Sequence, residues 1–158
     1  MSANEKVIRT FYAALNDHDA SFLVTLYTDT IRFGDPVFPN LVGDQAKNMW
    51  RMLCSRSKDL KVEVHDIIVD NKKGTAIWEA WYTFGTTGRK VHNIIHARYE
   101  FEDGKIVRHE DSFSFWRWSR QALGPIGLLL GWSPFLLNKV RATARTSLAA
   151  FSSQNTHR

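Results

Sequence analysis

Apolar residues recurring at three- and four-residue spacing predict helices in the first third of the chain. Residues 4–16 form the clearest case, with one apolar stripe that would face a core. Residues 19–27 and 45–56 show shorter versions of the same pattern. A short strand over residues 30–33 and a loop over residues 34–40, rich in Gly and Pro, separate these two helices. The stripe of the first helix consists of Val7, Ile8, Phe11, Tyr12 and Leu15.

Alternating polar and apolar residues predict strands in the middle of the chain. The alternation covers residues 61–70, 75–84, 91–102 and 106–118, and short turns join these segments. The turn at Asp103-Gly104 is the strongest signal, because this dipeptide is typical of two-residue hairpins. Helices followed by such a meander predict an α+β fold, with the helices packed on one face of a curved antiparallel sheet.

An uncharged stretch over residues 121–138 follows the last predicted strand. It reaches the lower length limit for a membrane span, but its Gly and Pro residues break a continuous helix. We expect it to lie over the mouth of the domain. Residues 135–151 then predict a helix with one buried face and a basic rim.

The chain is therefore expected to form one domain over residues 1–118. A C-terminal extension over residues 119–158 would pack on that domain, and its last residues would be disordered.

Composition narrows the class of protein. A chain of 158 residues is long enough for one domain with a core, and 13% aromatic residues indicate a large core or an aromatic-lined cavity. Cys54 is the only cysteine, so an internal disulfide and a structural zinc site of the cysteine type are excluded. A reducing compartment fits this cysteine usage, and we expect a cytoplasmic protein.

The net charge of +5 belongs to the end of the chain. Residues 1–116 contain 15 Lys and Arg against 16 Asp and Glu, whereas residues 117–158 contain six basic residues and no acidic one. Only Lys139, Arg141 and Arg145 fall on one predicted helix, which is too few phosphate contacts for strong nucleic-acid binding. We therefore expect no nucleic-acid partner. A membrane contact is not expected either, because Gly and Pro interrupt the uncharged stretch 121–138, which is expected to cover the domain.

Four segments of the chain resemble the ketosteroid isomerase and SnoaL-like branch of the nuclear-transport-factor-2-like superfamily. These are Phe-Tyr-Ala-Ala-Leu-Asn at 11–16, Phe-Gly-Asp-Pro-Val at 33–37, Gly-Arg-Lys at 88–90 and Phe-Glu-Asp-Gly-Lys-Ile at 101–106. The resemblance implies a cone-shaped α+β barrel around a deep apolar pocket, and it implies that a dimer is common. Because this fold hosts isomerases, cyclases, epoxide hydrolases, dehydratases and binding modules, it does not select the function.

Asp35 is the first candidate for chemistry. The Asp-Pro-Val match implies that it stands where ketosteroid isomerases carry their proton-shuttling carboxylate. Such a carboxylate needs apolar neighbours that raise its pKa, and Phe33, Val37 and Phe38 are suitable. Asp before Pro is also a common turn residue, so a purely structural role stays open.

Two further groups of the isomerase site are missing from the matching positions. Phe11 stands where those enzymes have a tyrosine. The position of their late-strand acid falls near Ala97, which is not an acid. Tyr12 follows Phe11 directly but points about 100° away around the helix. Loss of one oxyanion donor typically lowers the rate by about two to three orders of magnitude, which argues against steroid isomerisation by the family mechanism.

His109, Asp111 and Phe113 form a second candidate group. They share one face of the last predicted strand, and the resemblance implies that this face lines the pocket. SnoaL-like cyclases place an acid–base carboxylate on a late strand, and Asp111 resembles that group. Asp111 would orient or acidify His109, whereas the structural alternative is a hydrogen-bonded pair that braces the strand.

Candidate binding residues come from the pocket-facing positions. Alternation in the strand 91–102 places Asn93 on the more apolar face and His92 and His96 on the opposite face, where a dimer interface is possible. Because His92 and His96 lie about 13 Å apart along the strand, we expect no metal site. The candidate binding side chains are Tyr12, Trp50, Trp78, Tyr82, Asn93 and Phe113. Ordinary core packing would equally explain some of them.

Two functional hypotheses follow. The first is an enzyme, an isomerase, cyclase or lyase, that uses Asp35 as base and the Asp111–His109 pair as partner on a small apolar carbonyl compound. The alternative is a non-catalytic module that binds an apolar ligand. An epoxide hydrolase is less favoured, because Arg98 alternates away from Asp111 and would not complete an Asp–Arg–Asp set. We expect no cofactor, and a homodimer formed through the sheet.

Overall fold

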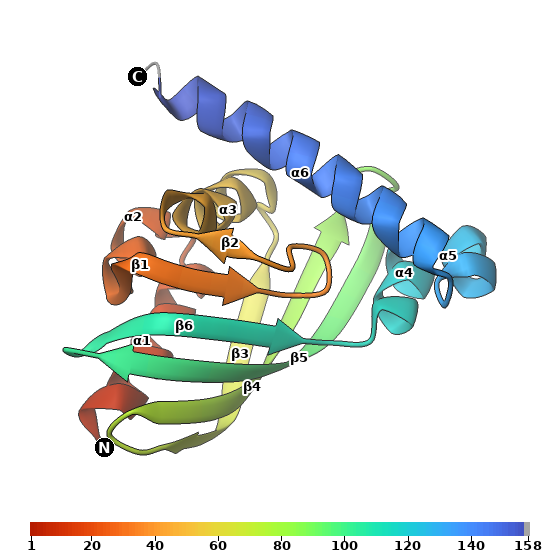
Figure 1. Cartoon of the computed structure of the whole chain (residues 1–158). Helices are drawn as coiled ribbons and strands as arrows, with labels where there is room; N and C mark the ends of the chain where they lie inside the picture. The colour runs from red at the N-terminus through yellow and green to blue at the C-terminus, as the bar shows by residue number, and fades with distance from the viewer. Residues whose placement is uncertain (157–158) are drawn as a thin grey trace.

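The computed structural model describes residues 1–156 and confirms the predicted α+β class (Figure 1). Its helices are α1 (Ala3–Asn16), α2 (Ala20–Leu23), the 3-10 turn η1 (Val24–Leu26), α3 (Asp44–Arg56), α4 (Phe115–Leu123), α5 (Pro125–Leu130) and α6 (Pro134–Thr156). Its strands are β1 (Tyr27–Gly34), β2 (Leu41–Val42), β3 (Lys61–Val69), β4 (Lys73–Phe84), β5 (Arg89–Glu102) and β6 (Lys105–Ser112).

The six strands form one curved sheet in the order β2-β1-β6-β5-β4-β3 (Figure 1). β1 pairs in parallel with β6, whereas the neighbours from β6 to β3 form the expected antiparallel meander. The sheet stays open between its edge strands, so the fold is a cone with a gap and not a closed barrel. α1 packs against β3 and α3 against β1, which buries the apolar faces of both helices inside the curve.

Local sequence explains why the first helix forms where it does. The Ser2 side chain accepts a hydrogen bond from the backbone N–H of Glu5, which satisfies one free donor of the first turn. Its predicted apolar stripe is buried, and Ile8, Phe11 and Leu15 are fully covered. The predicted alternation in β5 is also confirmed, because every second residue from Val91 to Phe101 is buried.

The end of the last strand differs from the prediction. Alternation suggested a strand over residues 106–118, but β6 ends at Ser112 and α4 begins at Phe115. The Ser114 side chain accepts a hydrogen bond from Arg117 N–H and so caps a new helix. Trp118 and Ala122 then lie four residues apart on the buried face of α4, which is a helical spacing.

The C-terminal extension crosses the wide end of the cone and then α3 (Figure 1). α4 packs Trp118 and Ala122 against Val91 of β5, and the boundary expected at residue 118 falls inside this helix. α6 is longer than the helix expected over residues 135–151, and a hydrogen bond of 3.2 Å joins Asn48 of α3 to its residue Ser152. The expected disorder at the very end concerns residues 157–158, outside the described residues. Within residues 1–156, no helix is both long and apolar enough to cross a membrane.

Candidate functional site

Asp35 lies in the loop after β1, where the backbone folds around its side chain. The loop is narrow, because a Cβ atom at Gly34 would stand 2.9 Å from the Pro39 carbonyl oxygen. Oδ1 of Asp35 accepts hydrogen bonds from the backbone N–H groups of Val37, at 2.7 Å, and Phe38, at 2.6 Å. Asp35 therefore forms the turn that is expected where Asp precedes Pro. This turn holds the half-buried carboxyl group in one orientation.

The surroundings of Asp35 favour its protonated form. Burial raises the pKa of the Asp35 carboxyl to about 7, and the negative charge of Asp111 adds to the rise. The two backbone N–H donors and the positive charge of Arg141 act in the opposite direction but do not cancel the effect of burial. The structure thus provides, near the wide end of the cone, a carboxyl group that changes charge close to neutral pH.

His109 and Asp111 form a hydrogen-bonded pair on the inner face of β6. His109 is fully buried, and its Nε2 lies 2.8 Å from Oδ1 of Asp111. The same Oδ1 accepts a hydrogen bond of 3.3 Å from the indole N–H of Trp78 on β4. The predicted proximity of His109 and Asp111 is present, and two donors from different strands hold the Asp111 carboxylate in place.

Hydrogen bonds on the other side of His109 assign its tautomer. The indole N–H of Trp50 donates to the Tyr27 hydroxyl oxygen at 2.8 Å, so the hydroxyl proton is free to point toward Nδ1 of His109, 2.7 Å away. In a neutral imidazole ring this arrangement makes Nδ1 the acceptor and Nε2 the donor to Asp111. A continuous chain of hydrogen bonds therefore runs from Trp50 on α3 to Asp111 on β6.

A pair of buried phenols borders the same chain. The hydroxyl groups of Tyr12 on α1 and Tyr99 on β5 are hydrogen-bonded to each other, and the Tyr99 ring lies 4.7 Å from that of His109. Burial raises the pKa of both phenols well above the usual value, and the charge of Asp111 adds to the rise. Both hydroxyls therefore stay protonated at neutral pH. The hydroxyl of Tyr12 is directed to Tyr99 and is buried with it.

The remaining predicted side chains lie at different depths of the cone. Trp50 is fully buried and belongs to the core, and Asn93 is buried on the inner face of β5. Tyr82 and Phe113 are half-buried near the wide end, where the Tyr82 hydroxyl accepts a hydrogen bond of 2.7 Å from Trp118 of α4. Burial and the charge of Asp35 raise the pKa of Tyr82 to about 12, which relates Tyr82 electrostatically to the Asp35 loop.

Sequence reasoning missed several residues of this arrangement. Tyr27 is the last residue of the apolar pattern over residues 19–27, and no local pattern distinguishes it from the other aromatic residues. Arg141 of α6 donates from Nε to the Pro36 carbonyl oxygen at 2.8 Å, although the two residues are 105 positions apart in the chain. Such contacts depend on tertiary structure. The basic rim of the last predicted helix was the only signal that pointed toward Arg141.

The opposite face of the sheet carries groups unrelated to this chain of hydrogen bonds. His92 stacks on Trp81 and bonds Glu79, whereas His96 is exposed. Arg98 forms an ion pair with Glu110, which confirms that it points away from Asp111. Within residues 1–156, no group of three or more His, Cys, Asp or Glu side chains is arranged to hold a metal ion.

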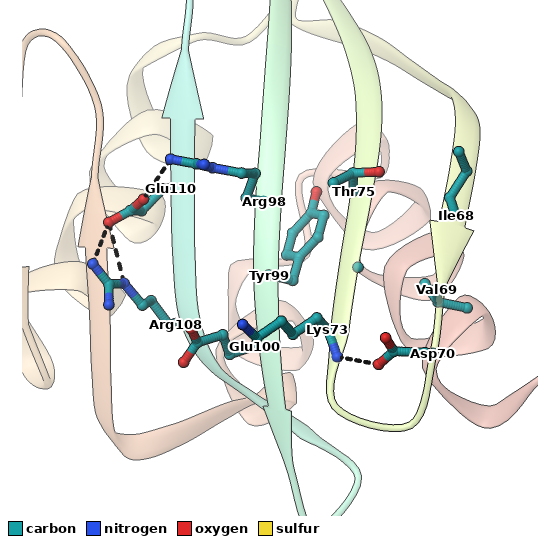
Figure 2. A pocket seen from close by; sticks show the side chains of 11 residues that line it. Ile68, Val69, Asp70, Lys73, Thr75, Arg98, Tyr99, Glu100, Arg108 and Glu110 are labelled. Atoms are coloured by element: carbon teal, nitrogen blue, oxygen red, sulfur yellow. Dashed lines mark hydrogen bonds and ion pairs between the residues drawn. The ribbon is translucent and has the colours of Figure 1, made fainter.

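An open surface cavity of about 520 Å³ also lies away from Asp35, beside the β3–β4 hairpin (Figure 2). Arg98, Arg108 and Glu110 line one side of it, and Ile68, Val69 and Asp70 line the other. The core between the helices and the sheet, by contrast, is filled by aromatic side chains, of which Phe11, Tyr27 and Trp50 are fully covered.

The fold is that of the nuclear-transport-factor-2-like class. The model of the SnoaL-like domain family matches residues 8–109, and the chain belongs to this family. No curated protein matches it.

Several solved structures share the fold. One is an NTF2-like protein of unknown function from Burkholderia pseudomallei, with a TM-score of 0.67 and 17% identity over 77% of this chain and 98% of that one. IdmH of Streptomyces antibioticus, provisionally assigned as a polyketide cyclase, has a TM-score of 0.64 and 18% identity over 75% and 96%. An LEH-like epoxide hydrolase from M. tuberculosis has a TM-score of 0.64 and 19% identity over 81% and 96%. Identities this low establish the fold alone.

Proposed function

We propose that this protein catalyses proton transfer on a small apolar carbonyl compound, as an isomerase, cyclase or lyase, with Asp35 as the group that carries the proton. The observation that carries the proposal is the half-buried Asp35 carboxyl, which two backbone N–H groups hold in one orientation and whose pKa burial raises to about 7. With such a pKa the carboxylate and the carboxylic acid coexist near neutral pH, which suits a group that first takes and then returns a proton. Membership of a family whose fold relatives include a provisionally assigned polyketide cyclase supports this choice.

In the proposed reaction, a carboxylate oxygen of Asp35 removes a proton from the carbon next to the carbonyl group. The electron pair of the broken C–H bond moves into an enolate, and Asp35 becomes a carboxylic acid. In an isomerisation Asp35 then returns the proton to a different carbon of the substrate, whereas in an elimination the proton goes to the leaving oxygen. Either route restores the carboxylate and requires no external oxidant or reductant.

The position of Asp111 supports a role as the partner of Asp35. Asp111 of β6 stands directly opposite Ala97 of β5 in the strand register, and directly opposed side chains have Cβ atoms about 5 Å apart. Ala97 is the position near which ketosteroid isomerases carry their second acid, so this chain offers a carboxyl group one strand away. His109 acts in the proposal as a positioning residue, because it holds Asp111 through its Nε2 hydrogen bond.

A non-catalytic module that binds an apolar ligand is the second candidate. Oδ1 of Asp35 accepts hydrogen bonds from two backbone N–H groups, so this carboxylate has a structural role in the turn. A structural role for Asp35 favours the non-catalytic module. In both candidates we place the ligand beside the Asp35 loop, where Arg141 of α6 contacts the Pro36 carbonyl oxygen.

The two candidates differ in one measurement. Apolar ketones that raise the melting temperature of the full chain are selected first, and the exchange of their α-protons for deuterium is then followed by NMR. The wild-type protein is expected to accelerate exchange. Asp35→Asn, which keeps the shape and an acceptor oxygen, should slow exchange about a hundredfold or more while it still binds the ketone.

Asp103→Asn supplies the matched control. Asp103 is an exposed carboxylate in the β5–β6 turn, and its positive φ of 51° is accepted by asparagine. With this variant the α-protons of the ketone should exchange at the wild-type rate. Ketone binding without any accelerated exchange would overturn the enzyme proposal in favour of the binding module, and equal exchange by Asp35→Asn would remove Asp35 from the mechanism.

A further inference from the structure

α5 and the turn that follows it expose an unusual concentration of large apolar side chains. Ile126 is 59% exposed, Leu129 67%, Trp132 72% and Phe135 71%. Leu128 and Leu130 are also exposed, so almost every large side chain between residues 126 and 135 faces solvent. We call residues 126–135 the apolar tip. It lies at one end of the molecule, where α5 projects beyond the sheet (Figure 1). Contiguous exposed apolar surface of this kind marks an interaction site.

The glycines of α5 explain why its leucines point outward. A Cβ atom at Gly127 would lie 1.9 Å from the Ser119 carbonyl oxygen, and one at Gly131 would lie 2.2 Å from the Ser119 hydroxyl. α5 therefore packs on α4 through glycine, backbone against backbone. A helix with small residues on its packed side and leucines on its free side has the arrangement of helices in lipid, the reverse of an ordinary helix of a water-soluble domain.

Basic side chains surround the apolar tip. The Arg120 guanidinium lies 4.6 Å from the ring centre of Trp116, and Trp116 in turn donates from its indole N–H to the Leu128 carbonyl oxygen. Lys139 is exposed one helical turn after Phe135. After Asp111 the chain contains no acidic residue at all. The apolar tip is thus bordered by positive charge without acidic side chains from its own segment to neutralise it.

We propose that the apolar tip docks this protein on the surface of a lipid bilayer that contains anionic headgroups. Ile126, Leu129 and Trp132 enter the boundary between headgroups and acyl chains, while Arg120 and Lys139 contact the headgroup phosphates. The six residues of α5 rise about 9 Å along the helix axis, which suits a shallow insertion. The proposal stands independently of the proposed chemistry at Asp35.

Charge argues for lipid over a second copy of the chain. If two copies met through their apolar tips, the basic residues of one segment would face those of the other, with no acidic residue of either segment between them. An anionic bilayer supplies the opposite charge. The sequence alone led us to expect no membrane contact, because the uncharged stretch was expected to cover the domain. That expectation was wrong for α5, because α4 packs on the sheet at Val91 and leaves the large side chains of α5 exposed.

Sedimentation with vesicles tests the proposal on the full chain. Vesicles of phosphatidylcholine mixed with phosphatidylglycerol are expected to retain the protein, and vesicles of phosphatidylcholine alone should bind it about tenfold or more weakly. Leu129→Gln should weaken binding to the mixed vesicles about tenfold, because it removes one inserted leucine. Ile68→Gln is its matched control, since Ile68 is 73% exposed on β3 and outside the apolar tip. It should leave binding unchanged.

A second pair of variants separates specific charge from net charge. Lys139→Gln should weaken binding to the mixed vesicles several-fold. Lys105→Gln should not, because Lys105 is an exposed residue at the start of β6, outside the apolar tip. Absence of binding to the mixed vesicles would overturn the proposal. So would a wild-type dimer in solution that Leu129→Gln converts to a monomer, because the apolar tip would then be the interface of two copies. Equal losses in each variant and its control would likewise refute a role for the apolar tip.

Discussion

Nε of Arg141 donates a hydrogen bond of 2.8 Å to the carbonyl oxygen of Pro36, and this contact ties the C-terminal helix to the loop that holds Asp35. Because Pro36 directly follows Asp35, this hydrogen bond joins α6 to the backbone next to the candidate catalytic residue. The Arg141 charge also lowers the pKa of Asp35 against the larger effect of burial. The extension outside the matched family segment therefore influences both the geometry and the charge of the candidate site.

Removal of Arg141 should shift the pH dependence of any reaction based on Asp35. In Arg141→Gln the pKa of Asp35 is expected to rise above about 7, because the opposing positive charge is lost. The active carboxylate then appears at higher pH, and α-proton exchange near neutral pH should fall a few-fold while its maximum at high pH is retained. The exchange rate measured across pH gives the midpoint directly.

Arg145→Gln is the control for this prediction. Arg145 lies one turn further along α6, is exposed, and carries the same charge. Its pH profile should coincide with that of the wild type. Identical profiles for both arginine variants would show that the charge of Arg141 does not act on Asp35.

The raised pKa of Asp35 also predicts how stability depends on pH. The pKa is about 7 in the folded chain and near the usual 3.8 in the unfolded chain, so the folded state binds more protons between these values. The contribution of Asp35 to stability should therefore fall as the pH rises from about 4 to about 7 and then level off. Asp35→Asn removes this loss and should be more stable than the wild type at about pH 8, by an amount of order a few kcal/mol at most.

Urea unfolding at several pH values checks this sign. The difference between Asp35→Asn and the wild type should be small near pH 4, where the wild-type carboxyl is protonated as well. Asp103→Asn should follow the wild-type curve over the whole range. A stability difference that did not grow with pH would contradict the assignment of the raised pKa to Asp35.

Most of the fold was predictable because its elements carry regular patterns. The apolar stripe of α1 and the alternation of β5 result from burial of one face, and that burial leaves a periodic signal in the sequence. The end of β6 was not predictable from periodicity, since Phe113 and Phe115 continue the alternation past the strand. The cap at Ser114, a single local hydrogen bond, turns the chain into α4.

The candidate site was predictable only where its residues share one element. His109 and Asp111 are two residues apart on one strand, so alternation placed them together. Tyr27 completes the hydrogen bonding of His109 from 82 positions away, and Arg141 reaches Pro36 from 105 positions away. No periodic pattern encodes such distances. The outward direction of the α5 leucines was also hidden, because it depends on which side of the helix meets α4.

The buried hydrogen bonds of Tyr27 should contribute more to stability than those of a half-buried tyrosine. Tyr27→Phe leaves the Trp50 indole N–H and Nδ1 of His109 without their partner in a fully buried position, and should lower the free energy of unfolding by about 1–3 kcal/mol. Tyr82→Phe removes a hydroxyl that also pairs with an indole, but at a half-buried position that water can reach. Its effect should be smaller in the same urea experiment. Equal effects would contradict the expected dependence on burial.

Gly127 and Gly85 offer a matched pair for the packing of α5. In Gly127→Ala the new Cβ atom meets the Ser119 backbone 1.9 Å away, so α5 must move off α4. This substitution should destabilise the protein by about 1–3 kcal/mol, although alanine favours a helix over glycine. Gly85→Ala places its Cβ atom in open space, and should change the stability by less than about 1 kcal/mol in either direction. Thermal unfolding of both variants measures the contrast. A neutral Gly127→Ala would mean that α5 does not pack on α4 through glycine, and the outward position of its leucines would then lose its structural explanation.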